Sequence, residues 1–328
     1  MEVLRAPTEE EVKASKFLSE HKEEQEKAYQ AIRDIISNRK NLDDILEDSN
    51  SLFEKQQAYL GEINTDKKIV FVGDTHGAFD VTLYTLMRFL RDDTVGKIVF
   101  LGDYVDRGPE SLENLILILR EALAEKEKGN EGKLVILRGN HESPITNYYY
   151  GFVNELSKKV PEYPYEKFVE MFSNMPYAIT VNGYFCVHGG LAKDMNSDSL
   201  SDFLKDVNKL NSLPKAKGDQ EPSDPVAMQI LWNDPRDCID GFLPNVRGEG
   251  TFYFGRKVVK DFLDSNNQKG IKIKGIIRAH EVKDGYSWEM DGKVITVFSS
   301  RYHQMSAGVL IMDENKSFHV LKILGENE

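Results

Sequence analysis

The chain has few cysteines, no long apolar run and no basic cluster, and each absence excludes a class of protein. Only two cysteines, Cys186 and Cys238, occur in 328 residues, which excludes a disulfide framework and favours two buried free thiols in a reducing compartment. No segment reaches the roughly 18 apolar residues of a membrane span, and the first residues lack the apolar stretch of a secretory signal. We therefore expect a soluble, cytoplasmic protein with no membrane partner.

The charge balance argues against nucleic acid as a partner. Acidic residues number 54 and basic residues 42, so the formal net charge is −12. Because polyanions are bound by clustered Lys and Arg, and no such cluster appears, we expect no nucleic-acid binding. Hydrophobic residues make up 40% of the chain, which is ordinary for a globular protein that folds around a large core.

Residues 1–65 differ in amino-acid composition from the rest of the chain. They are rich in Glu, Lys, Gln and Asp, and their apolar residues recur at helical spacing, as in Ala28, Ile32, Ile35 and Ile36. Asn41 precedes Asp43 and Asp44 and is predicted to cap a helix. We expect a helical N-terminal extension over 1–65, packed by one apolar face on a domain formed by 66–328.

From Lys67 onwards, short β-branched runs alternate with amphipathic helical segments. The predicted order is strand, helix, strand, helix, strand and a Tyr-rich helix, over 69–72, 81–91, 97–101, 112–126, 134–137 and about 144–150. This alternation indicates an α/β fold with a mainly parallel sheet covered by helices. After Tyr177 the chain reads as hairpins, with turns at Asn182–Gly183, Asp291–Gly292 and Asp313–Lys316.

Five of the apolar runs end in polar segments. GDTHG follows the first run, GDYVDRG the second and RGNHE the third, and two later runs lead to HGG at 188–190 and to RAHE at 278–281. Ligands of α/β sheets bind at the carboxyl ends of strands. These segments are therefore expected to bring together Asp74, His76, Asp103, Asn140, His188 and His280.

This set of side chains suits metal ions. Carboxylate, amide and imidazole ligands without cysteine fit Mn, Fe or Zn, and a shared carboxylate would make a two-metal site that acts on phosphoryl groups. Each segment alone is weak, because Gly and Asp are common in turns and a lone His is more often packed or exposed. The five together favour a metal site.

The sequence motifs resemble those of a known protein family. GDTHG, GDYVDRG, LRGNHE, VHGGL, LWNDP, a later RG and RAHE occur in the order found in the metal-dependent phosphoprotein phosphatase family of serine/threonine phosphatases. The similar stretch runs from about Lys67 to about Ile323. The resemblance implies a metallophosphoesterase-like four-layer α/β/β/α sandwich, in which two mixed β-sheets are flanked by helices, here with a helical N-terminal extension.

The resemblance also implies a role for each site residue. Asp74 and His76 would bind one metal ion, Asp103 would bridge two, and Asn140, His188 and His280 would bind the second. His141 would be the general acid, with Asp106 holding its ring. Arg107, Arg247, Asn140 and Tyr302 would contact the phosphate. The implied cofactors are two divalent ions, with Mn²⁺ favoured over Fe or Zn.

The implied activity is hydrolysis of phosphoserine and phosphothreonine in protein substrates. The reaction would be direct in-line attack by a hydroxide that bridges the two metal ions, and a regulatory subunit is left open. A dinucleoside-polyphosphate hydrolase of the same superfamily is the alternative. A non-catalytic phosphate-binding module is disfavoured, because every expected metal and acid position is intact.

Three segments leave alternatives open. Residues 299–308 read SSRYHQMSAG, whereas the family has Ser-Ala-Pro-Asn-Tyr and a Cys-containing loop, so Arg301 either adds charge near the pocket or lies on the surface. Trp232 either forms a pocket wall or packs in the core. Tyr148–Tyr150 could form an aromatic groove, but packing of their helix on the sheet is the favoured interpretation.

Overall fold

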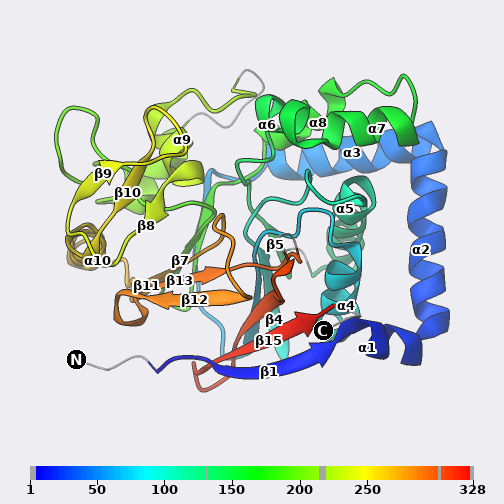
Figure 1. The fold of residues 1–328 in the computed structure, drawn as a ribbon, viewed down its shortest axis with the longest axis horizontal. Helices are drawn as coiled ribbons and strands as arrows, with labels where there is room; N and C mark the ends of the chain where they lie inside the picture. Colours follow the sequence, from blue (N-terminus) through cyan, green and yellow to red (C-terminus); the bar gives the residue numbers. More distant parts are fainter. Residues whose placement is uncertain (1–4, 131, 214–218, 302–303, 326–328) are drawn as a thin grey trace.

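The computed structural model describes residues 5–130, 132–213, 219–301 and 304–325 (Figure 1). Its elements follow one another in the order β1 Thr8–Lys13, α1 Ala14–Glu20, α2 Lys22–Ser37, α3 Arg39–Glu54, β2 Tyr59–Ile63, β3 Lys68–Val72, α4 Phe79–Phe89, β4 Val95–Phe100, α5 Ser111–Glu127, β5 Leu134–Ile136, α6 Pro144–Tyr150, α7 Phe152–Lys159, α8 Glu166–Ser173, β6 Ala178–Val181, β7 Tyr184–Val187, η1 Val207–Ser212, α9 Pro225–Trp232, β8 Asp234–Pro235, β9 Phe242–Pro244, β10 Phe252–Phe254, α10 Arg256–Gln268, β11 Gly275–Arg278, β12 Tyr286–Glu289, η2 Met290–Gly292, β13 Val294–Val297, β14 Ala307–Met312 and β15 Phe318–Leu324.

The first sheet has the strand order β1-β15-β14-β3-β4-β5. Its strands β3, β4 and β5 are parallel and are connected by α4 and α5, as the alternation of runs predicts. Side chains alternate across the sheet, so Val70 and Val72 face the helices while Ile69 and Phe71 face the second sheet. Both faces are buried, which explains why these strands are continuous apolar runs.

The second sheet has the strand order β12-β13-β11-β7-β6-β2. The predicted hairpins are confirmed as the antiparallel pairs β6–β7, β12–β13 and, in the first sheet, β14–β15. In the β6–β7 turn Asn182 has φ 49° and Gly183 has φ 83°. Two consecutive left-handed residues are what a two-residue hairpin requires, and Asn-Gly is the pair that adopts them most readily.

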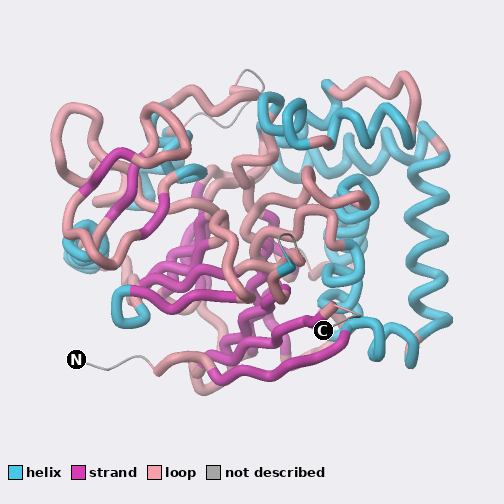
Figure 2. The backbone as a smooth tube through the Cα atoms, viewed as in Figure 1, coloured by secondary structure: helices cyan, strands magenta, loops and turns pink. Residues whose placement is uncertain are grey.

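The two sheets pack face to face, and helices cover their outer faces (Figure 2). One buried cluster lies between the first sheet and the helices α1 to α5, α7 and α8, a second between the two sheets, and a third between the second sheet and α9 and α10. The expected four-layer α/β/β/α architecture is therefore confirmed. A smaller sheet, β8-β10-β9, lies beside α9 and α10 (Figure 1).

The first 65 residues are not helical throughout, which corrects the sequence-based expectation. The strand β1 pairs in parallel with β15 at the edge of the first sheet, and β2 pairs with β6 in the second sheet. The helix α3 begins at Arg39, because the side chain of Asn38 accepts hydrogen bonds from the backbone N–H groups of Lys40 and Asn41. Asn41 is thus inside the helix rather than its cap. The boundary between 1–65 and 66–328 stays a prediction.

Two further expectations can be compared with the structure. Both cysteines are free, but Cys238 is exposed, so the expectation of two buried thiols is correct for Cys186 alone. Within the described residues, no helix has both the length and the apolar character needed to cross a bilayer.

Candidate dinuclear metal centre

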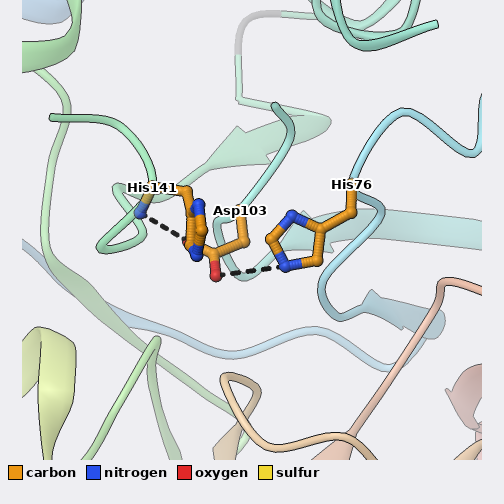
Figure 3. A group of neighbouring side chains, drawn as sticks. All are labelled: His76, Asp103 and His141. Atoms are coloured by element: carbon orange, nitrogen blue, oxygen red, sulfur yellow. Dashed lines mark hydrogen bonds and ion pairs between the residues drawn. The ribbon is translucent and has the colours of Figure 1, made fainter. Parts of the chain in front are cut away.

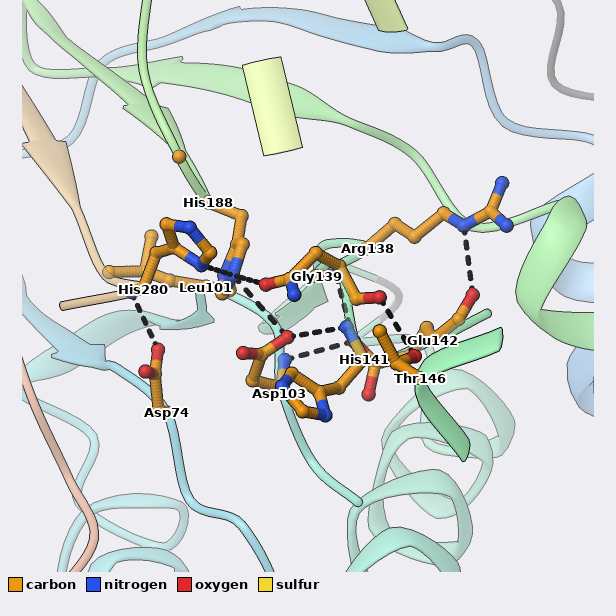
Figure 4. A network of polar contacts seen from close by, with 12 residues as sticks. Asp74, Leu101, Asp103, Arg138, Gly139, His141, Glu142, Thr146, His188 and His280 are labelled. Atoms are coloured by element: carbon orange, nitrogen blue, oxygen red, sulfur yellow. Dashed lines mark hydrogen bonds and ion pairs between the residues drawn. The ribbon is translucent and has the colours of Figure 1, made fainter. Parts of the chain in front are cut away.

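The predicted metal ligands come from both sheets. Asp74, Asp103 and Asn140 follow β3, β4 and β5 of the first sheet, whereas His188 and His280 follow β7 and β11 of the second. Because β7 and β11 are parallel neighbours, their carboxyl ends lie together, and the packing of the sheets places them opposite those of the first sheet. The side chains converge in one buried network (Figure 4).

Asp103 lies at the middle of this network. Its Oδ2 is 3.7 Å from His76 Nε2 and its Oδ1 is 3.3 Å from His188 Nε2. Two groups of candidate ligands share this carboxylate, one formed with His76 and His141 (Figure 3) and the other with His188 and His280. A carboxylate with one oxygen toward each group suits a bridging ligand between two metal ions.

The histidine tautomers are set by backbone carbonyls. His76 Nδ1 is 2.8 Å from the carbonyl oxygen of Val105, and His188 Nδ1 is 2.9 Å from that of Leu101. Since a carbonyl only accepts, each Nδ1 carries a proton and donates, which turns each Nε2 toward Asp103. This orientation by a hydrogen bond on the far side of the ring is typical of metal-binding histidines.

The surroundings of His280 indicate whether a cation fits between the candidate ligands. Its backbone N–H donates to Asp74 Oδ1 at 2.8 Å, while its Nδ1 lies 3.2 Å from His188 Nε2. Its Nε2 is buried and has no hydrogen-bond partner among the residues that the structure describes. Burial lowers the pKa of His280 well below its ordinary value, so the ring is a neutral imidazole with lone-pair character to share. Two such rings in contact are better accounted for by a cation than by packing.

The two buried aspartates also fit a cation. Burial, followed by the charge of Asp103, raises the pKa of Asp74 to about 6. Burial opposes ionisation of Asp103 as well, but His188 and His141 outweigh it and hold its pKa well below the usual range. Two carboxylates this close repel each other unless positive charge lies between them. The donor set of carboxylate, amide and imidazole therefore fits two divalent ions, which would supply Lewis acidity at this point.

His141 is held differently from the other histidines. Its Nδ1 donates to Asp106 Oδ2 at 2.7 Å, and its backbone N–H donates to Asp103 Oδ1 at 2.9 Å. Asp106 in turn accepts hydrogen bonds from Asn147 Nδ2 and from the backbone N–H of Phe152, both at 2.9 Å. Burial disfavours the charged ring, yet Asp103 and Asp106 outweigh it and raise the pKa of His141. A protonated, fixed imidazole is what a general acid requires.

The two predicted phosphate-binding arginines approach the site from different elements. The Arg107 guanidinium lies 4.3 Å from the centroid of the Tyr150 ring, which is itself 5.1 Å from the His141 ring. Arg247 donates to Asp234 Oδ2 at 2.5 Å and to the carbonyl oxygen of His280 at 3.2 Å. The fold therefore brings Arg107 beside His141 and Arg247 beside His280.

Several of these residues have left-handed backbone conformations. His76, Asp103, Asp106, Arg107 and His280 have φ of 44°, 58°, 71°, 68° and 70°. Non-glycine residues rarely adopt positive φ, and strained positions that the surrounding fold maintains gather at functional sites. The strain turns the chain sharply after β3, β4 and β11, which directs these side chains into the network rather than along the strands.

Glycines and one glutamate make the close approach of the loops feasible. A Cβ on Gly102, whose φ is 110°, would lie 2.8 Å from His188 Nδ1, and a Cβ on Gly139 would collide with the side chain of Asp103. Glu142 accepts hydrogen bonds from the backbone N–H groups of Asp103, Tyr104 and Gly139 at 2.8–2.9 Å. Glu142 follows His141 in the chain, and these bonds join the loops after β4 and β5.

Other residues of the site were missed or interpreted differently from sequence. Tyr148 and Tyr149 are 75% and 77% exposed, so the favoured interpretation that they pack on the sheet is wrong. Tyr150 contacts His141 and Arg107, although nothing in its local sequence distinguishes it from its neighbours. Trp232 lies edge-on to His280 with ring centroids 5.5 Å apart, which places it at the site.

The segment 299–303 is described in part. Arg301 forms an ion pair with Asp80, whereas Tyr302 and His303 lie outside the described residues. The predicted role of Tyr302 at the phosphate therefore stays a prediction.

The comparisons with known proteins agree with this geometry. The profile of the calcineurin-like phosphoesterase family matches residues 67–284. The chain is 33% identical over 269 residues to serine/threonine-protein phosphatase T of Schizosaccharomyces pombe, covering 81% of this chain and 53% of the relative. The corresponding protein of Saccharomyces cerevisiae is 33% identical over 271 residues, with coverage of 81% and 48%. The chain thus spans about half the length of these curated relatives.

A solved structure extends the likeness to the fold. A protein serine/threonine phosphatase from Saccharomyces cerevisiae superimposes with a TM-score of 0.73 at 27% identity, covering 88% of this chain and 91% of that one. The matched segment 67–284 contains every candidate ligand from Asp74 to His280, together with His141 and both arginines. The chain belongs to the calcineurin-like phosphoesterase family.

Proposed function

We propose that the protein is a serine/threonine protein phosphatase that hydrolyses phosphomonoesters of phosphoserine and phosphothreonine at a dinuclear metal centre. The observation that carries the proposal is the fixed pair of His141 and Asp106 beside the carboxylate of Asp103. In this arrangement His141 would act as a proton donor next to the residues that would hold the two metal ions. The names of the similar proteins support the same activity and favour it over a dinucleoside-polyphosphate hydrolase.

The chain's own residues have separate tasks in this reaction. When bound, the metal ions supply positive charge to the phosphate and lower the pKa of water at the site. His141 donates the proton of its Nε2 to the leaving oxygen of serine or threonine, because its Nδ1 is engaged by Asp106. Asp106 keeps the ring protonated and in one orientation, and its bonds to Asn147 and Phe152 fix Asp106 itself.

The arginines bind the substrate. Arg107 and Arg247 would contact phosphate oxygens from opposite sides, since one lies by His141 and the other by His280. The planar guanidinium can donate two parallel hydrogen bonds to a phosphate, which a lysine cannot do. The stacking of Arg107 on Tyr150 and the bond of Arg247 to Asp234 position each group before substrate arrives.

The proposal is tested by assaying purified protein, loaded separately with Mn²⁺, Fe²⁺ and Zn²⁺, on two substrate classes. One class is a panel of phosphoserine, phosphothreonine and phosphotyrosine peptides, and the other is a dinucleoside tetraphosphate. We expect phosphoserine and phosphothreonine peptides to be hydrolysed fastest, and chelation followed by Mn²⁺ to restore activity. A preference for the dinucleoside, or for phosphotyrosine, would contradict the substrate assignment.

A single turnover in ¹⁸O-labelled water tests the route. One labelled oxygen in the released phosphate would mean that water attacks phosphorus rather than carbon, and direct attack further requires that no covalent phosphoprotein forms. Isolation of a phosphorylated protein would refute direct hydrolysis. The preference for Mn²⁺, a regulatory subunit and cytoplasmic location stay predictions.

A further inference from the structure

The N-terminal helices contact the segment that carries two of the metal ligands. Tyr29 of α2 packs on Phe79 with ring centroids 4.6 Å apart. Phe79 is the first residue of α4 and follows the loop 73–78, which contains Asp74 and His76. Phe79 is buried, whereas Tyr29 is half-buried. A ring from the extension therefore covers the point at which the metal-binding loop turns into helix α4.

A second contact ties the same point to the loop after β13. Asp80, in the first turn of α4, forms an ion pair with Arg301. The backbone N–H of Ser299 donates to the carbonyl oxygen of Asp74 at 3.0 Å, and Ser299 Oγ accepts from the N–H of Gly73 at 2.8 Å. The loop after β13 is thus bonded to both ends of the segment 73–80.

Residues of the extension lie beside this ion pair. Ser15 and Leu18 of α1, with Gln25 and Tyr29 of α2, line a small cavity of about 250 Å³ together with Asp80 and Arg301. The side chains of Arg301 and Asp80 remain 27% and 34% exposed, so the helices α1 and α2 flank this ion pair without burying it. They lie against the contact that joins the metal-binding loop to the loop after β13.

We propose that the N-terminal extension is an intramolecular brace for the metal-binding loop, in which Tyr29 and Asp80 are positioning residues that hold Asp74 and His76 in their ligating arrangement. The inference rests on the metal centre proposed above. It predicts that the extension sets metal affinity as well as stability. Loss of the brace lets the segment 73–80 sample more conformations, so binding a metal ion must first restore the arrangement.

The test measures Mn²⁺ affinity of the metal-stripped full chain by titration calorimetry. We expect Tyr29→Ala and Asp80→Asn to weaken binding by at least about threefold, the order of magnitude of coupling between touching residues. Tyr29→Phe keeps the ring and should bind Mn²⁺ as the wild type does. Melting temperature is recorded for each variant, so that a change in affinity can be separated from a change in stability.

Two matched controls lie in the same extension. Phe17→Ala removes another ring that packs on α4, at Tyr84 with centroids 5.0 Å apart, away from the loop. Asp43→Asn removes a carboxylate of similar exposure, 35% against 34% for Asp80, from its pair with Lys167. Both should lower the melting temperature and leave Mn²⁺ affinity within about twofold. Equal loss of affinity in all four variants, or none in Tyr29→Ala and Asp80→Asn, would overturn the brace. A wild-type chain that binds no Mn²⁺ would overturn the metal centre itself.

Discussion

The histidines of the site differ in the hydrogen-bond partner of their Nδ1 atom, and we expect this difference to set their roles. His76 and His188 donate from Nδ1 to backbone carbonyls and direct Nε2 at Asp103, whereas His141 donates from Nδ1 to a carboxylate. A hydrogen bond from Nδ1 to a carbonyl fixes the ring with Nε2 toward the proposed metal site, whereas a bond to a carboxylate stabilises the protonated ring. We therefore expect the hydrogen-bond partner of Nδ1 to decide whether a histidine acts as a metal ligand or as the general acid.

An experiment can distinguish a role of His141 as general acid from a role as metal ligand. His141 also lies within reach of the group formed by His76 and Asp103, so it could in principle act as a ligand. We expect His141→Asn to lower kcat roughly 100-fold or more, the usual range for loss of general acid catalysis, with Mn²⁺ content unchanged. His21→Asn, on the exposed start of α2, is the control for loss of an imidazole and should have full activity. A drop in Mn²⁺ content for His141→Asn would instead make His141 a ligand.

The environment of Asp74 predicts how metal binding depends on pH. The pKa of this carboxyl is raised to about 6 by burial and by Asp103, and only its ionised form binds a cation. Below pH 6 a proton on Asp74 competes with the metal, so Mn²⁺ affinity should fall by up to about tenfold for each pH unit there, and Asp74 adds no further change above pH 6. Calorimetric titrations at pH 5, 6, 7 and 8 measure this slope. Constant affinity between pH 5 and 7 would show that Asp74 ionises at its ordinary pKa.

At the scale of helices and strands, the elements that carry the site could be predicted from sequence. Each of β3, β4 and β5 is a buried apolar run followed by Gly and Asp or Asn, and the position of the ligands follows from the end of the run. The pairing of strands across two sheets could not be predicted this way, because register and sheet membership depend on contacts between distant segments. Which residues contact Asp103 is therefore known only from the structure.

The N-terminal strands show why the remaining elements were missed. The strand β1 has the sequence TEEEVK and is exposed along most of its length, so it shows no apolar alternation and forms because β15 offers an open edge. Strand β2, YLGEI, contains a glycine with φ of 87°, and its apolar pattern is too short to distinguish it from a loop. In both cases the strand is specified by its partner rather than by its own residues.

The cap of α3 provides a stability prediction at the same scale. Asn38 Oδ1 accepts from the N–H groups of Lys40 at 3.0 Å and Asn41 at 3.3 Å. We expect Asn38→Ala to lower the free energy of unfolding by about 1 kcal/mol, the usual cost of losing a side-chain cap. Asn41→Ala is the matched control and should change it by less than about 0.5 kcal/mol. Urea unfolding followed by circular dichroism measures the free energy of unfolding of both variants. A larger loss for Asn41→Ala than for Asn38→Ala would restore Asn41 as the cap.

For the whole molecule, the net negative charge of the chain has a consequence for the binding of a negatively charged substrate. The net charge is −12, while the proposed substrate carries a phosphate dianion. A net negative charge would repel a phosphoprotein at long range, so we expect its binding to depend on the local charge of Arg107, Arg247 and the two proposed metal ions. Local attraction and long-range repulsion differ in their response to salt, because the Debye length falls from about 30 Å at 0.01 M to about 8 Å at 0.15 M.

The different salt dependence allows local attraction and long-range repulsion to be measured separately. Two phosphoserine peptides of equal length, one flanked by Glu and one by Lys, present the same phosphate to the site and differ only in distant charge. Raising the ionic strength from 0.01 to 0.15 M should lower KM for the Glu-flanked peptide and raise it for the Lys-flanked one, since screening removes repulsion in the first case and attraction in the second. A peptide with uncharged flanks is the control for screening at the phosphate itself. If KM rises for both charged peptides by the same factor, the acidic surface has no part in substrate selection and the local charge at the two arginines and the metal centre governs binding alone.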